Sequence, residues 1–326
     1  MTQLKPLYQP KPEPMKLAIF ISGSGTNAQR IIDKYIDDRD KGVVAFEPIL
    51  MFTDNPESRA RHLAKEQYKD KGVELLYFPN SIQDFYRSVH CKDMRNMEAR
   101  ALYDLKQQSL LTDLGIDTVA LAGYEWLVTE AIFNNFTTLN VHPGDKRLKF
   151  PGTNLPMLGG LGWVPSAKAI YIGENQVRST VFLVDEGLDT GANLSISAPQ
   201  QLHEDILGMP LEDRIKLLGD ALKLVNATPI PGDLNSLNPF IRAISKYIRE
   251  HSELIDEEIA AKFPIVGYGK EGQNRLKEHG DWVIYPRTID GLARGDFARD
   301  GNGLIHYKGV PKPNGIIFDL NGNVVG

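Results

Sequence analysis

Short apolar runs alternate with helix-length amphipathic segments along most of the chain. The runs are too short for helices and are bounded by turn residues, which indicates strands buried on both faces of a sheet. Strands separated by helix-length stretches predict right-handed crossovers and a mostly parallel sheet. The predicted strands cover residues 16–21, 46–52, 73–78, 117–123, 137–141, 178–184 and 193–198.

A break in this pattern suggests a second part of the chain. Residues 226–239 (NATPIPGDLNSLNP) contain three prolines and little apolar periodicity, which is typical of a linker. We therefore expect a Pro-rich leader at 1–14, a main α/β domain at 15–225, this linker, and an α+β extension at 240–326. The extension is predicted to begin with an amphipathic helix and to end in a hairpin at Asn321-Gly322.

Composition narrows the class of protein. The 326 residues carry a formal net charge of −5 and a single cysteine, Cys91. A weakly acidic chain has no general attraction for nucleic acid or anionic membranes, and one cysteine excludes an intramolecular disulfide framework. No apolar run approaches the ~20 residues that span a bilayer, and the polar N-terminus lacks the core of a signal peptide. These features predict a soluble cytoplasmic protein.

The first predicted strand ends in a glycine-rich loop. Glycines let a backbone turn tightly and approach a ligand, and free amides at a helix N-terminus attract phosphate. The loop also fits a plain strand-to-helix turn capped by one of its last two side chains. Its two glycines and Ala28 fit the dinucleotide pattern G-x-G-x-x-A, with Asp54 where a ribose-binding acid would stand. All three interpretations stay open for the loop, Ser22-Gly23-Ser24-Gly25-Thr26-Asn27.

A second candidate site ends the strand predicted over 137–141. Asn140 and His142 stand two residues apart, so their side chains point to the same side of an extended chain. An amide donor beside an imidazole can stabilise an oxyanion while the imidazole moves a proton. The acidic turn 185–191 places Asp189 where it could fix the imidazole tautomer. The alternative is a buried structural histidine and an ordinary turn aspartate, and no residue spacing indicates a metal site.

Five motifs occur together in the order and approximate spacing of the folate-dependent formyltransferases. They are 21–27 (ISGSGTN), 121–124 (LAGY), 139–143 (LNVHP), 151–152 (PG) and 185–191 (DEGLDTG). The chain resembles this family over about residues 15–198. The resemblance implies a Rossmann-like formyltransferase fold with a mostly parallel twisted sheet, in which 15–225 is the catalytic domain.

The resemblance also implies a reaction. A formyl group would pass from 10-formyltetrahydrofolate, the co-substrate, to the amine of a small phosphorylated substrate. The branch that formylates glycinamide ribonucleotide in purine biosynthesis is the most similar. Alternatives are an amino-sugar nucleotide or methionyl-tRNA as acceptor, an NAD-dependent oxidoreductase built on the glycine loop, and a folate-binding protein without turnover.

Roles for individual residues follow from the same resemblance. Asn140 would donate to the oxyanion, His142 would stabilise that charge and relay a proton, and Asp189 would orient His142. Thr180 stands where the family places a supporting hydroxyl. The implied phosphate contacts are Gly23, Ser24, Gly25, Thr26 and Asn27, and the implied folate contacts are Tyr124, Glu125, Trp126, Leu127, Val128, Asp185, Glu186, Gly187 and Leu188.

The chain also departs from the family pattern. Relatives usually read Ser-Leu-Leu-Pro where this chain has the charged loop 144–149 (GDKRLK), which is either a solvated surface loop or an anion contact. The segment 125–128 lacks an arginine found in the purine enzyme. Residues 227–326 carry 12 Lys and Arg against 13 Asp and Glu, which argues against a tRNA-binding appendage. We expect this region to serve packing or homo-oligomerisation.

Overall fold

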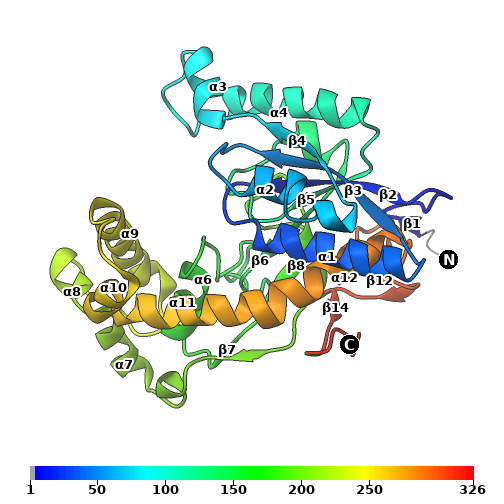
Figure 1. Ribbon diagram of the computed structural model, residues 1–326. Coiled ribbons are helices and arrows are strands. Elements are labelled where there is room, and N and C mark those ends of the chain that lie inside the picture. Colours follow the sequence, from blue (N-terminus) through cyan, green and yellow to red (C-terminus); the bar gives the residue numbers. More distant parts are fainter. Residues whose placement is uncertain (1–3) are drawn as a thin grey trace. The chain divides into compact units, whose positions relative to one another are not determined.

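The computed structural model describes residues 4–326, shown in Figure 1, and its contacts divide the chain into two compact units. The first unit holds the chain up to Val141, then Val181–Ile196 and Trp282–Gly326, and the second holds His142–Thr180 and Ser197–Asp281. This division differs from the expected boundaries at 225 and 239. A composition break marks one point along a chain, whereas this chain leaves the first unit and returns to it twice.

An eight-stranded sheet forms the centre of the first unit. Its strands, in spatial order, are β14 (Ile316–Ile317), β9 (Asn193–Ile196), β8 (Thr180–Leu183), β6 (Thr137–His142), β5 (Thr118–Leu121), β2 (Met15–Ile21), β3 (Phe46–Thr53) and β4 (Leu76–Pro79). β2 is parallel to both β3 and β5, β3 to β4, β5 to β6, and β14 to β9. The predicted α/β fold with a mostly parallel sheet is therefore confirmed.

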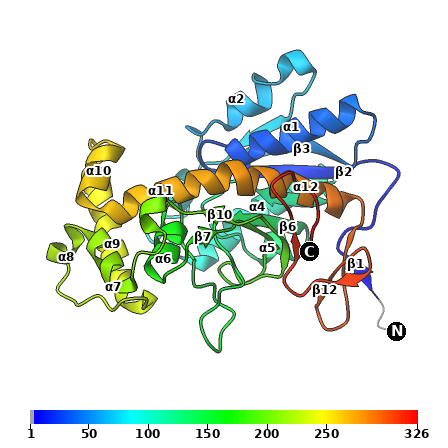
Figure 2. The same cartoon turned by 90° about the horizontal axis from the view of Figure 1, so that it is seen from below.

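Both faces of this sheet are covered by helices, which explains why its strands are apolar throughout. In β2, Leu17 and Ile19 pack on one face, and Ala18 and Phe20 pack on the other. Figure 2 shows α1 and α2 on one side of β2 and β3. The helical segments of this unit are α1 (Thr26–Asp40), α2 (Ala60–Lys65), η1 (Lys69–Lys71), α3 (Ile82–Ser88), α4 (Met97–Asp113), α5 (Glu130–Phe133) and α12 (Trp282–Ala293).

Residues 4–14 of the expected leader belong to the first unit, and residues 1–3 lie outside the described residues. β1 (Lys5–Pro6) pairs with β11 (Phe297–Arg299) in a small antiparallel sheet completed by β12 (Ile305–Tyr307) and β13 (Val310–Pro311). Tyr8 is buried in the main core cluster. The two ends of the chain thus contribute to the same unit, which proline content alone does not reveal.

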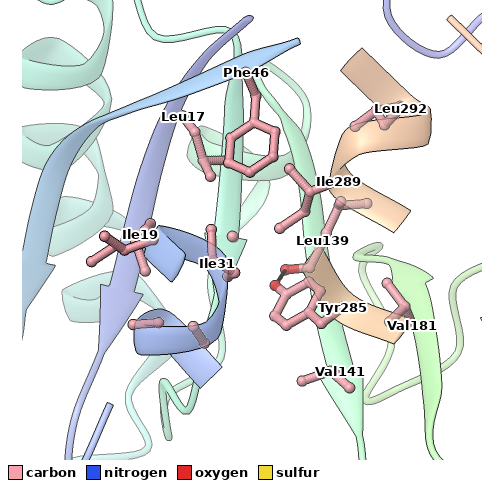
Figure 3. Close-up of a cluster of buried hydrophobic side chains, with 14 of the residues drawn as sticks. Leu17, Ile19, Ile31, Phe46, Leu139, Val141, Val181, Tyr285, Ile289 and Leu292 are labelled. Carbon is pink, nitrogen blue, oxygen red and sulfur yellow. Dashed lines mark hydrogen bonds between the residues drawn. The ribbon is translucent and has the colours of Figure 1, made fainter. Parts of the chain in front are cut away.

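The C-terminal residues complete the core of the first unit. α12 buries Ile289 and Leu292 in the cluster that holds Leu17 and Leu139, as Figure 3 shows. The Tyr285 hydroxyl, also on α12, lies 2.9 Å from the Leu139 carbonyl oxygen and 3.2 Å from that of Leu121. α12, which belongs to the predicted C-terminal α+β region, therefore contacts the main chain of β5 and β6 directly.

The predicted C-terminal hairpin is confirmed. Phe318 and Val324 form an antiparallel bridge across the turn, and Gly322 has φ +79°, a conformation that favours glycine. The Asp319 carboxylate accepts hydrogen bonds from the amides of Asn321 and Asn323, which closes the turn.

The second unit is mainly helical. Its core contains Phe240, Ile241 and Ile244, the stripe predicted from helical spacing. α9 begins at Leu234, so the last residues of the expected linker are helical. The helices and strands of the second unit are α6 (Val164–Tyr171), β7 (Gln176–Val177), β10 (Gln200–Gln201), η2 (Glu204–Ile206), α7 (Leu211–Arg214), η3 (Ile215–Leu218), α8 (Ala221–Leu224), α9 (Leu234–Glu250), α10 (Asp256–Lys262), α11 (Pro264–Leu276) and the π-helical η4 (Lys277–Asp281).

Within residues 4–326, no helix has the length and apolar character needed to cross a membrane.

The hydroxyl of Tyr285 offers a test of the contribution of α12. Tyr285→Phe removes the hydrogen bond to the β5 and β6 carbonyls and keeps the ring in the core. We expect the free energy of unfolding, measured by urea denaturation, to fall by about 1 kcal/mol. Tyr35→Phe is the control, because within the described residues the Tyr35 hydroxyl makes no hydrogen bond. Equal stability of the two variants would contradict the assignment.

Candidate active site

Parallel pairing places four strand ends at one edge of the first unit's sheet. Phe20 of β2 is in register with Leu121 of β5, and Leu121 is in register with Asn140 of β6. Ile21, the last residue of β2, is in register with Thr53 at the end of β3. The glycine loop, Asp54, the segment 122–128 and Asn140 therefore all begin at this carboxyl edge, where open α/β sheets bind ligands.

The buried carboxylate of Asp54 ties three of these segments together. Its Oδ1 accepts a hydrogen bond from the Ser22 hydroxyl at 2.5 Å, and its Oδ2 accepts one from the Trp126 indole N–H at 2.8 Å. The Ser22 hydroxyl oxygen in turn accepts a bond from the Glu125 amide at 3.0 Å. Burial raises the pKa of Asp54, and the bonds from Ser22 and Trp126 oppose that rise.

These contacts weaken the dinucleotide interpretation. A ribose-binding acid must offer its oxygens to a ligand, whereas both oxygens of Asp54 are occupied by Ser22 and Trp126, and the residue is only 5% exposed. Asp54 is thus an anchor for the glycine loop. Asp54 does follow a strand, as the dinucleotide pattern requires, but the contacts of its carboxylate do not support a ribose-binding role.

The glycine loop leads into α1 without a side-chain cap. Gly25 is the N-cap at φ +64°, so the alternative of an N-cap at Thr26 or Asn27 does not hold. A Cβ on Gly25 would lie 2.6 Å from the Leu63 side chain, so the turn requires glycine there. Among the described residues, a Cβ on Gly23 would meet no atom within 4 Å, so there is open space beside Gly23. Asn27 Oδ1 is buried and has no hydrogen-bond partner within residues 4–326.

The predicted folate segment 124–128 divides into core and accessible residues. Tyr124 and Val128 are each 7% exposed and belong to a core cluster, so their side chains stabilise the segment. Glu125 and Leu127 are exposed. Trp126 is half-buried and lines a pocket of about 710 Å³.

A buried ion pair on α4 holds both ends of this segment. Arg100 Nη2 donates to the Tyr124 hydroxyl at 2.8 Å, and Asp104 Oδ2 accepts from the Thr129 amide at 2.6 Å. Arg100 and Asp104 pair with each other at 3.2 Å, and burial raises the pKa of Asp104. Sequence reasoning missed this pair, although two opposite charges four residues apart on a helix were a visible signal.

The pocket beside Trp126 has aromatic walls and three basic side chains. Its remaining lining residues come from α3 and the segment after it: Gln83, Tyr86, Arg87, His90, Cys91, Lys92 and Met94. Arg87 pairs with Asp84 at 2.5 Å, and Arg87, His90 and Lys92 are all exposed.

The acidic loop 185–191 connects β8 to β9 in a tight turn. The Asp185 carboxylate accepts hydrogen bonds from the Gly187 amide and the Thr190 hydroxyl, so it stabilises the loop internally. Asp189 has φ +55°, an uncommon conformation for a residue with a side chain. Glu186 and Leu188 are exposed, Leu188 to 60%.

Asn140 and His142 both lie on β6, as predicted. Asn140 Oδ1 accepts a hydrogen bond from the Val141 amide at 2.8 Å. His142, the first residue of the second unit, is 4% exposed, and its Nε2 lies 2.9 Å from the Leu158 carbonyl oxygen. Because a carbonyl only accepts, Nε2 carries the proton of this bond.

The turn after His142 supports the imidazole. A Cβ on Gly144 would lie 2.7 Å from His142 Nε2, so glycine leaves the room that the ring occupies. The Thr180 hydroxyl donates to the Gly144 carbonyl at 2.9 Å and accepts from the Lys146 amide at 3.3 Å. Thr180 thus holds the turn that packs against the histidine.

The charged loop 144–149 differs from a solvated surface loop. Lys146 is only 3% exposed. Arg147 pairs with Asp145 through two nitrogens, at 2.8 and 2.6 Å, and this hydrogen bonding raises the pKa of Arg147. The expectation of a solvated loop is therefore wrong for Lys146, because charges that alternate in sequence can be satisfied within a folded turn.

Comparison with known proteins identifies the family. A family model described as formyl transferase matches residues 15–222, and the chain belongs to this family. The sequence is 26% identical over 247 residues to the chloroplastic phosphoribosylglycinamide formyltransferase of Arabidopsis thaliana, covering 68% of this chain and 74% of the relative. The Haemophilus influenzae phosphoribosylglycinamide formyltransferase is 27% identical over 179 residues, covering 54% and 69%. The prediction of a formyltransferase is thus confirmed for the family.

Solved structures extend the likeness in fold. The phosphoribosylglycinamide formyltransferase of Coxiella burnetii has a TM-score of 0.52 at 15% identity, covering 94% of this chain and 100% of that one. Glycinamide ribonucleotide transformylase 1 of Symbiobacterium toebii has a TM-score of 0.50 at 17% identity, covering 91% and 95%. The likeness in fold therefore reaches beyond residue 198, into the region that the sequence motifs left unexplained.

The raised pKa of Asp54 predicts a pH dependence of stability. The folded chain holds a proton on Asp54 at a higher pH than the unfolded chain, whose pKa is about 3.9. The free energy of unfolding of the natural chain, relative to Asp54→Asn, should therefore fall as pH rises from about 4 through the folded pKa. Urea denaturation of both proteins from pH 4 to 7 measures this difference. A difference that is constant or rises with pH would contradict the assignment.

Proposed function

We propose that this chain transfers the formyl group of 10-formyltetrahydrofolate to the amine of glycinamide ribonucleotide. The observation that carries the proposal is His142, a buried imidazole held by Nε2 at the end of the strand that also presents Asn140. Membership of the formyl transferase family and the names of two similar relatives support the reaction and the acceptor.

The chemistry assigns a role to each of three residues. The substrate amine attacks the formyl carbon, a C–N bond forms, and the carbonyl electron pair moves onto oxygen. Asn140 Nδ2 donates to that oxyanion, and His142 stabilises the charge. The oxyanion then collapses, the bond to the folate nitrogen breaks, and the proton lost by the amine passes through His142 to that nitrogen. Asp189 orients His142 and assists the proton transfer.

The glycine loop is the proposed phosphate site. Among residues 4–326, no side chain caps the N-terminus of α1, and space is open beside Gly23. A helix N-terminus with free amides favours an anion. Asn27 Oδ1 is buried and unpartnered within the described residues, and in this proposal it would accept a hydrogen bond from a ribose hydroxyl next to that phosphate.

The pocket beside Trp126 is the proposed site for the donor. The indole is fixed by its hydrogen bond to Asp54, and the apolar walls suit the aromatic part of a folate. The glutamyl end of a folate carries carboxylates, which the exposed cations of Arg87 and Lys92 would attract. Glu125, Leu127 and the loop 185–188 complete the proposed folate contacts.

The central prediction concerns the two titratable groups of the mechanism. His142→Ala and Asp189→Asn should each lower kcat by about 10²–10⁴-fold because each removes the proton transfer or its orientation. Release of tetrahydrofolate measures transfer to glycinamide ribonucleotide, to an amino-sugar nucleotide and to methionyl-tRNA in parallel. Near-normal turnover in both variants would contradict the mechanism, and transfer only to another amine would replace the acceptor.

A charge reversal tests the donor site. Lys92→Glu and Arg87→Glu should raise the KM for the folate donor by about two- to fivefold each, as expected for exposed charges. The increase should be larger for a polyglutamylated donor and smaller at high salt. Arg95→Glu is the matched control, because Arg95 is exposed on the same segment but does not line the pocket. Equal effects of all three reversals would contradict this placement.

A further inference from the structure

Two arginines of the second unit share one carboxylate. Arg147 binds Asp145 through Nε at 2.8 Å and through Nη2 at 2.6 Å. Arg178 Nε lies 3.9 Å from the same carboxylate. Since one carboxylate balances one of two positive charges, the group formed by these three residues carries an excess positive charge.

The charge of Arg178 is poorly compensated. Its Nη1 donates to the Ser197 carbonyl at 3.0 Å, which is a neutral acceptor, and the distance of 3.9 Å to Asp145 is too long for a hydrogen bond. The Arg178 side chain is only 21% exposed. Burial lowers the pKa of Arg178, the charge of Arg147 lowers it further, and Asp145 opposes both effects. A second anion beside Arg178 would offset this cost.

Both guanidinium groups keep N–H groups available for such an anion. Among residues 4–326, Nη1 of Arg147 and Nη2 of Arg178 make no hydrogen bond. Neither atom is a buried atom without a partner, so both reach solvent. A guanidinium is a planar fork of donors that matches the oxygens of a phosphate or a carboxylate.

The main chain places this pair near His142. Asp145 follows His142 by three residues, so their Cα atoms are at most about 11 Å apart. Thr180 follows Arg178 by two residues, and its hydroxyl donates to the Gly144 carbonyl at 2.9 Å. The two arginines therefore flank the turn that packs against the histidine.

We propose that Arg147 and Arg178 form an oxyanion subsite of the second unit, which takes a phosphate or carboxylate group near His142. Asp145 competes with the ligand for both guanidinium groups. The binding of an oxyanion does not depend on the proposed function, whereas its place in the reaction rests on that function. The oxyanion belongs either to a substrate or to a separate small anion, and kinetics distinguish these two sources.

Inorganic phosphate is the probe for the subsite. The protein is labelled with ¹⁵N-arginine and titrated with phosphate at constant ionic strength, and the Nε–H signals are assigned by their absence in Arg147→Gln, Arg178→Gln and Arg275→Gln. Arg275 is the matched control, because it also donates to a main-chain carbonyl but has the Glu271 carboxylate to itself at 2.6 Å. The signals of Arg147 and Arg178 should shift with one common Kd, and that of Arg275 should not follow. Because each signal belongs to one residue, this subsite is distinguished from the proposed phosphate site at the glycine loop.

Two kinds of variant should change the phosphate Kd in opposite directions. Arg178→Gln, followed by the Arg147 signal, should raise the Kd about five- to tenfold, because charge-assisted hydrogen bonds are lost. Asp145→Asn should lower the Kd, because it removes the competing negative charge and keeps an oxygen that accepts from Arg147. If Arg178→Gln does not fold, Arg147→Gln, followed by the Arg178 signal, replaces it.

Kinetics without added phosphate identify the source of the oxyanion. A raised KM for one substrate in Arg178→Gln, but not in Arg275→Gln, assigns the oxyanion to that substrate. Unchanged KM values, together with an effect of phosphate on the kcat of the natural chain that Arg178→Gln abolishes, assign it to a separate small anion.

Three results would overturn the proposal: phosphate shifts at Arg147 and Arg178 no larger than at Arg275, a Kd unchanged in Arg178→Gln, or a Kd raised in Asp145→Asn. The last result would indicate that the three residues serve only to hold the turn. A natural chain that transfers no formyl group but shows the phosphate response would contradict the proposed function and leave the subsite supported.

Discussion

Parallel pairing of β2 with both β3 and β5 is the constraint on which the candidate site of the first unit depends. It brings the ends of β2, β3, β5 and β6 to one edge, so segments far apart in sequence start side by side. The buried carboxylate of Asp54 then joins the glycine loop to the segment after β5. Replacing water by fixed donors around that carboxylate makes the edge a preorganised surface for ligands.

The strands and the position of the glycine loop could be predicted from the sequence because a strand buried on both faces is a continuous run of apolar residues. The run 16–21 is almost entirely apolar, and the loop after it contains Gly25 at a position where the tight turn requires a glycine. The hairpin at Asn321-Gly322 was predictable for the same reason, since its turn chemistry is local.

Other features depend on residues distant in sequence, and no local pattern reveals them. The Tyr285 hydroxyl contacts β5 and β6 from a helix more than a hundred residues later. Asp54 fits the position of a ribose-binding acid, and only the contacts of its two oxygens exclude that use. Likewise, the partner of His142 Nε2 is the main-chain carbonyl of Leu158, a group that any residue type provides. The division into two units followed neither proline content nor charge, because the chain enters each unit more than once.

A crystal structure with glycinamide ribonucleotide and a folate analogue that lacks a transferable formyl group tests the central claim most directly. The account predicts the substrate phosphate on the first amides of α1, beside Gly23, and the folate ring system against Trp126. We also expect the Asn140 and His142 side chains to contact the substrate amine or the folate analogue. Phosphate bound away from the glycine loop, or a folate bound without contact to Trp126, would contradict it.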